Sequence, residues 1–97
     1  MKLKPQALLE TFGVDQEQPG AQRWLRLVYS VALGRGVGAA AREIAAADGI
    51  TLRVLYGTMR RDLAPVLEAD PEALSYFEVP LKERTSTELA RVVAAYL

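Results

Sequence analysis

Apolar residues recur every three or four positions along most of this chain, and this spacing predicts amphipathic helices. The clearest stripe lies between residues 21 and 33 and consists of Trp24, Leu27, Val28 and Val31. Because the stripe is wholly apolar, we interpret Trp24 as a core anchor and not as a base-stacking residue. A similar stripe in the last segment consists of Leu89, Val92, Val93 and Tyr96.

Proline, glycine and capping residues divide this pattern into about six helices. We expect helices over residues 5–12, 21–33, 39–48, 51–63, a short one starting at 70–72, and 85–97. Pro65 should end or kink the fourth, and residues 77–84 should form an extended loop. Together these elements predict an all-α fold: a compact bundle of about six helices that makes one domain over residues 1–97 and contains a helix-turn-helix.

The helix-turn-helix runs from Arg42 to Leu63. Such a motif packs two helices at a steep angle through a short turn, which needs a small residue on the first helix and a residue tolerant of left-handed backbone in the turn. Ala45 and Gly49 stand at these two positions. The apolar residues placed to bridge the two helices are Ile44, Ile50 and Leu55.

A helical projection divides the second helix of the motif into two faces. The apolar face consists of Leu52, Leu55, Met59 and Leu63, and the opposite face of Arg53, Gly57, Arg60 and Arg61. A recognition helix requires this division, with its outer face against bases or phosphates. Asp48 counts against the motif because an apolar residue is usual there, and Gly57 indicates either close approach to a partner or a tolerated surface glycine.

Charged residues are unevenly distributed along the chain, although the formal net charge is zero. Residues 23–61 hold seven arginines against two acidic residues, a balance of +5, and residues 62–88 hold seven acidic residues against two basic ones, a balance of −5. This segregation predicts a surface with one basic side. Chance clustering on a solvated surface is the alternative.

The chain lacks the residues that several kinds of chemistry require. The chain has no cysteine and no histidine, so we expect no disulfide, no metal site, no cofactor and no catalytic activity. The glycines at 34–38 follow no predicted strand and lack a Lys-Ser/Thr ending, which favours a turn over a phosphate loop. No apolar run could span a membrane and no signal segment opens the chain, so we expect a cytoplasmic protein with no membrane partner.

Several segments resemble the C-terminal DNA-binding effector domain of the master sporulation response regulator of spore-forming bacteria. The similar segments are residues 8–14, 24–29, 43–45, 51–63 and 82–94. The resemblance implies a transcription regulator that binds double-stranded DNA, as tandem copies or a homodimer, and that contacts RNA polymerase or a sigma factor. The positions it would turn toward DNA are Thr51, Arg53, Tyr56, Gly57, Arg60 and Arg61.

The chain departs from that family where the family reads bases. A Glu-Arg pair of the family is replaced by Tyr56 and Gly57, and an arginine before the pair is replaced by Val54. We therefore expect phosphate binding to persist while the target sequence differs. The phosphorylated receiver domain is also missing, which indicates a fragment or a stand-alone relative; Met1 favours the latter.

A protein-interaction module that keeps this fold without specific DNA binding is the competing hypothesis. The zero net charge, the acidic last third and the lost Glu-Arg pair favour it. An enzyme would have to rely on acidic pairs such as Glu43 with Asp48, which we interpret as solvated helix surface.

Overall fold

The computed structural model describes residues 4–76 and 81–97, and every regular element in these ranges is a helix. The described ranges contain seven helices: α1 (Pro5–Thr11), α2 (Pro19–Ala32), α3 (Val37–Asp48), α4 (Leu52–Asp62), α5 (Ala64–Leu67), α6 (Pro71–Tyr76) and α7 (Ser86–Ala94). The predicted all-α class is confirmed, whereas the predicted count of six helices is too low by one. Residues 77–80 of the predicted extended loop lie outside the described residues.

The additional helix is α5, a single turn that follows α4. Pro65 has no amide hydrogen and cannot continue the α4 ladder, but proline is accepted in the first turn of a new helix. The Leu63 carbonyl accepts hydrogen bonds from the amides of Val66 and Leu67, at 2.9 and 3.0 Å. Both of these side chains are buried, so packing against the core stabilises a turn too short to show a helical repeat in the sequence.

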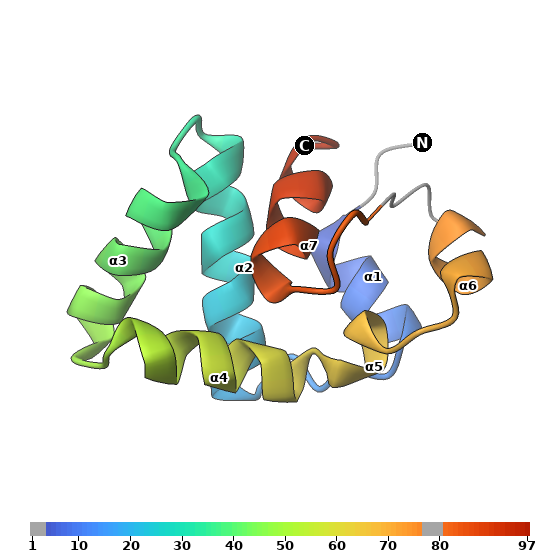
Figure 1. Cartoon of the computed structure of the whole chain (residues 1–97), viewed down its shortest axis with the longest axis horizontal. Coiled ribbons are helices and arrows are strands. Elements are labelled where there is room, and N and C mark those ends of the chain that lie inside the picture. Colours follow the sequence, from blue (N-terminus) through green and yellow to red (C-terminus); the bar gives the residue numbers. More distant parts are fainter. Residues whose placement is uncertain (1–3, 77–80) are drawn as a thin grey trace.

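Helix α2 occupies the centre of the fold and packs against α1, α3, α4 and α7 (Figure 1). Its Trp24 is fully buried, and the indole N–H donates to the Ser86 carbonyl at 3.0 Å. This bond satisfies the polar atom of a buried tryptophan and ties α2 to the first residue of α7. The interpretation of Trp24 as a core anchor is confirmed.

The N-terminus of α2 begins at Pro19, two residues before the predicted start at Ala21. Its cap comes from another helix, because the Gly20 amide donates to Oδ2 of Asp62 at 2.7 Å. The Asp62 side chain is 1% exposed, and a hydrogen bond to a charged group contributes about 1.5–3 kcal/mol. A carboxylate from α4 thus extends α2 beyond the start that the sequence predicts.

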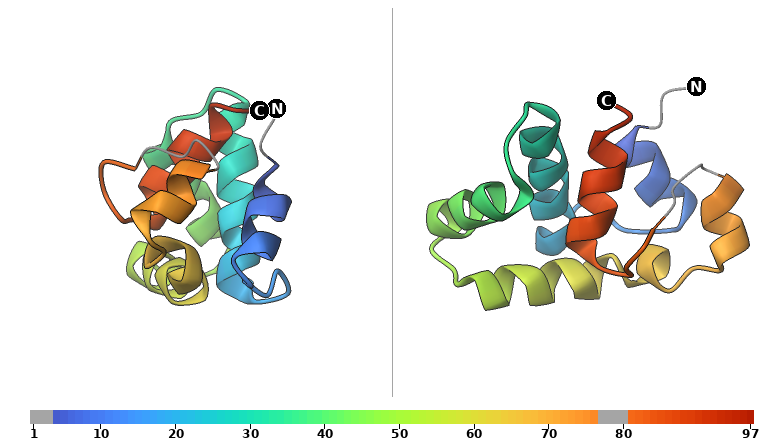
Figure 2. Two further views of the ribbon diagram at one scale, coloured as in Figure 1. Left: turned by 90° about the vertical axis from the view of Figure 1, so that its right-hand side faces the viewer. Right: turned by 45° about the horizontal axis from the view of Figure 1, so that its top comes forward.

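The helices are arranged so that α4 lies along one long edge of the molecule. Figure 1 shows α3 descending at one end to meet α4 at a steep angle, while α6 lies at the other end. The start of α7 comes down over α4, as the views in Figure 2 also show. The radius of gyration is 12.3 Å, close to the ~12.5 Å expected for a compact chain of this length.

Candidate nucleic-acid interface

The turn between α3 and α4 sets the direction in which α4 leaves α3. Gly49 ends α3 in the left-handed conformation, with φ of 66°, as the sequence predicts. The Ile50 amide then donates back to the Ala45 carbonyl at 3.0 Å, which closes the turn. The Thr51 hydroxyl accepts from the Val54 amide at 3.1 Å and caps α4, so this candidate DNA-facing residue has a structural role.

The inner face of α4 is packed into the core. Leu55 and Met59 are fully buried, and Ala45 of α3 is buried opposite them, as the projection predicts. At the far end Asp62 is also buried, and the Thr58 carbonyl oxygen together with the Asp62 carboxylate leaves Gly20 of α2 no room for a side chain. Helix α4 is therefore held at both ends, by the turn and by α2.

The outer face of α4 is exposed and carries no acidic side chain. Arg53, Gly57, Arg60 and Arg61 are all exposed, and the single acid of the helix, Asp62, is buried on the other side. Val54 lies at the edge of this face and is half exposed. The helix thus presents the cationic face that the sequence predicts.

The arginines of the outer face differ in their partners. Arg61 is engaged by Asp62 through an Nε–Oδ1 hydrogen bond of 2.8 Å, and this bond, together with the negative charge, raises the pKa of Arg61 above its ordinary value. Within residues 4–76 and 81–97, neither Arg53 nor Arg60 forms an ion pair or a side-chain hydrogen bond. These two guanidinium groups are therefore the ones free to bind an external anion on this face.

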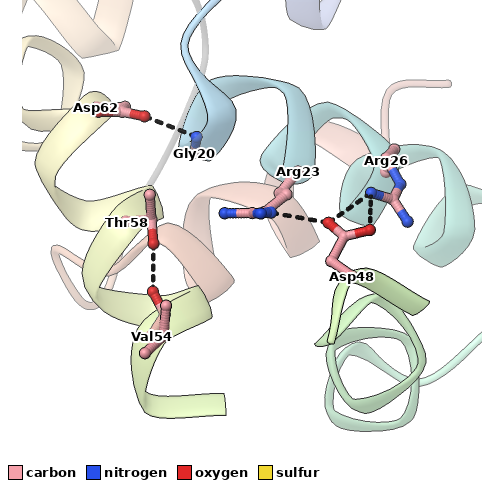
Figure 3. A network of polar contacts seen from close by, with 7 residues as sticks. All are labelled: Gly20, Arg23, Arg26, Asp48, Val54, Thr58 and Asp62. Carbon is pink, nitrogen blue, oxygen red and sulfur yellow. Dashed lines mark hydrogen bonds and ion pairs between the residues drawn. The ribbon is translucent and has the colours of Figure 1, made fainter. Parts of the chain in front are cut away.

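Asp48, which argued against the motif, has a clear role at the end of α3. Its carboxylate accepts hydrogen bonds from Arg23 at 2.8 Å and from Arg26 at 2.9 and 3.0 Å, both on α2 (Figure 3). The hydrogen bonds from Arg23 and Arg26 lower the pKa of Asp48 below its ordinary value. The acid that stands where the motif leads us to expect an apolar residue therefore joins the end of α3 to α2.

Ion pairs within the fold reduce the number of arginines that can contribute free charge to the predicted basic side. Of the seven arginines between residues 23 and 61, Arg23 and Arg26 pair with Asp48, Arg35 with Glu43 and Arg61 with Asp62. In the described part of the chain the other three, Arg42, Arg53 and Arg60, have no acidic partner. Among these seven arginines, the positive charge without an acidic partner is thus concentrated on α4 and on one position of α3.

Tyr56 and Gly57, at the positions of the family's base-reading pair, differ in accessibility. Tyr56 is half-buried and packs against the core, so only part of its ring reaches solvent. A Cβ added to Gly57 would meet nothing within 4 Å, so no neighbour within the chain requires glycine there. The backbone of α4 is consequently bare at the middle of its outer face.

Some residues beside this face were missed by sequence reasoning. A hollow of about 590 Å³ adjoins Tyr56 and Arg60 and is completed by Arg84, Thr85, Ser86 and Thr87. The sequence indicates a capping box at 85–88, and the Thr85 half of it is confirmed because its hydroxyl accepts from the Glu88 amide at 3.1 Å. The Glu88 carboxylate instead accepts from the Lys82 amide at 3.2 Å. Only the fold brings this segment, some 25 residues away in sequence, to α4.

Comparison with known proteins gives no further identification: no family model, no curated protein and no solved structure matches the chain. The resemblance to the sporulation effector domain therefore stays a prediction. None of the helices in the described ranges combines the length and apolar character needed to cross a bilayer.

Proposed function

We propose that this protein is a DNA-binding transcription regulator in which α3 and α4 act as a helix-turn-helix and α4 enters the major groove. The observation that supports this most is the outer face of α4, which is exposed, lacks any acid and carries Arg53 and Arg60 without acidic partners among the described residues. The major groove, about 12 Å wide, admits one α-helix. Arginines that meet phosphates there release counterions and stabilise the complex.

The proposed contacts are of two kinds: those that position the protein on the DNA and those that read the base sequence. Arg53 and Arg60 bind phosphates or base edges, while the bare backbone at Gly57 permits close approach of α4 to the groove floor. Arg61 contributes less, because its guanidinium already pairs with Asp62. Since Tyr56 and Gly57 replace the Glu-Arg pair of the resembled family, the target sequence is expected to differ from that family's promoter box.

The test is the salt dependence of DNA binding. A duplex is first selected from a random pool on the wild-type protein, and binding is then followed by fluorescence anisotropy between about 50 and 200 mM salt. We expect a linear fall of log K with log salt. Arg53→Ala and Arg60→Ala should each weaken binding and reduce the slope by about one unit if each contacts one phosphate.

The matched control is Arg35→Ala, which removes the same charge from the connection between α2 and α3, at the opposite end of α3 from α4 (Figure 1). Its salt slope should equal that of the wild type. Equal slopes for all four proteins, or a wild type that selects no DNA, would overturn the proposal.

A second candidate function is protein binding, and one observation favours it. Between α2 and α3 a hollow of about 520 Å³ is lined mainly by apolar side chains, among them Leu25, Tyr29 and Leu33. Leu33 is 85% exposed and Tyr29 is 42% exposed, so two large apolar side chains of this hollow face solvent together. RNA polymerase or a sigma factor is the partner that the resemblance implies. A wild type without salt-dependent DNA binding would favour this function over the first.

A further inference from the structure

The hollow beside α4 joins the start of α7 to the proposed DNA-binding face. Arg60 belongs to both, since it lies on the outer face of α4 and also lines the hollow. The opposite wall is formed by Arg84, Thr85, Ser86 and Thr87. Figures 1 and 2 show the start of α7, drawn in red, coming down beside α4. A ligand that covers the outer face of α4 would therefore reach the hollow.

Arg84 is held in place without being neutralised. Its Nη1 donates to the carbonyl oxygens of Leu67 and Ala69, at 3.4 and 3.0 Å, at the end of α5. Neither Arg84 nor Arg60 has a carboxylate partner in the part of the chain that the structure describes. Two arginines from separate elements thus line one concave surface, and neither has a carboxylate partner among the described residues.

Glu88, the acid that follows the residues of the hollow in the chain, is engaged by other groups. The Glu88 carboxylate accepts from Arg91 Nε at 2.8 Å and from the Lys82 amide at 3.2 Å, and Arg91 lowers the pKa of Glu88. The amides of Ser86 and Thr87, the first two of α7, have no acceptor among the described residues. Helix-terminal amides, hydroxyl groups and arginine are the groups that bind DNA phosphates in protein complexes.

We propose that this hollow binds a phosphodiester group of the DNA backbone at the edge of the groove that α4 occupies. The inference rests on the proposed function and adds to it a second contact element outside the helix-turn-helix. Arg60 and Arg84 supply the charge, and the start of α7 supplies the hydrogen-bond donors. A phosphate bound here fixes the position of α4 along the groove.

The test uses Thr87→Glu, with Thr87→Gln as the neutral control of nearly the same size. An acid in the first turn of α7 is favourable for the helix, so Thr87→Glu should fold as the wild type does. It places a negative charge in the hollow and should weaken binding to the selected duplex about tenfold at low salt, whereas Thr87→Gln should bind nearly as the wild type does. Arg84→Ala should reduce the salt slope by about one unit.

A series of duplexes, each with one phosphate replaced by a neutral methylphosphonate, locates the contact. One position should weaken wild-type binding but leave Arg84→Ala binding unchanged, because the variant has already lost that contact. If the wild type binds DNA and Arg53→Ala weakens it while Thr87→Glu and Arg84→Ala do not, this inference fails and the proposed function stands. If Arg53→Ala also has no effect, the proposed function fails.

Competition between inorganic phosphate and the duplex is the last part of the test. Millimolar phosphate should compete with the duplex for wild-type protein more strongly than chloride at equal ionic strength, and less so for Thr87→Glu. Saturable phosphate binding in the hollow without any effect of Thr87→Glu on DNA affinity would overturn the assignment to DNA.

Discussion

Two glycines inside helices have opposite surroundings. Gly20, in the first turn of α2, lies against α4: a Cβ there would clash with the Thr58 carbonyl oxygen and lie 2.5 Å from Oδ2 of Asp62. Gly57, in the middle of α4, would meet nothing within 4 Å. Gly20 thus permits helix packing, whereas Gly57 leaves a bare stretch of outer surface.

Replacing each of these two glycines by alanine should change the stability of the protein in opposite directions. Gly20→Ala should lower the free energy of unfolding by about 1–3 kcal/mol or more, because α2 and α4 must move apart. Gly57→Ala should raise it by about 0.5–1 kcal/mol, because alanine costs less entropy in a helix. Urea titration measures both values.

Each variant serves as the control for the other, since the chemical change is the same. The proposed close approach of DNA at Gly57 further predicts that Gly57→Ala, although more stable, binds the selected duplex more weakly. An unaffected Gly20→Ala would contradict the close contact between α2 and α4, and a destabilised Gly57→Ala would contradict the open surroundings of Gly57.

At the scale of elements, the apolar repeat predicts the longer helices because burial of one face determines them. It does not predict α5, which is one turn long, or the start of α2 at Pro19, which depends on a carboxylate 43 positions later in the chain. Capping chemistry is local, and so Thr51 and Gly49 could be assigned from the sequence. Contacts between distant segments, such as Asp62 with Gly20, leave no periodic signal.

The contact between α3 and α2 gives a pH-dependent prediction. Arg23 and Arg26 hold the pKa of Asp48 below its value in the unfolded chain, about 4. The pair therefore stabilises the fold fully above that pH, and the contribution is lost as the pH falls through the lower folded-state pKa. Asp48→Asn should be less stable than the wild type at pH 7, and the difference should shrink below about pH 4.

The measurement is urea unfolding across this pH range. Glu10→Gln is the control, because Glu10 is exposed and has no ion pair among the described residues, so its difference from the wild type should stay small at every pH. A difference for Asp48→Asn that persists unchanged at low pH would show that the carboxylate charge does not tie α3 to α2.

At the scale of the whole molecule, counting charges along the chain overstates the basic surface. Four of the seven arginines between residues 23 and 61 are paired within the fold. The face that stays free could be predicted from the helical projection of residues 51–63, which uses only local geometry. The hollow at residues 84–87 could not, because its residues reach α4 through the packing of α7 against α2 and α4, which leaves no local signal in the sequence.

The central claim is that the outer face of α4 is the DNA-binding surface. An NMR titration of isotope-labelled protein with the selected duplex at low salt tests it most directly, because each backbone amide reports its own surroundings. We predict that the largest shift changes fall on residues 53–61, with a second group at 84–87, while the hollow between α2 and α3 is unaffected. Shift changes confined to that hollow, or none on α4 while DNA binds, would contradict the claim.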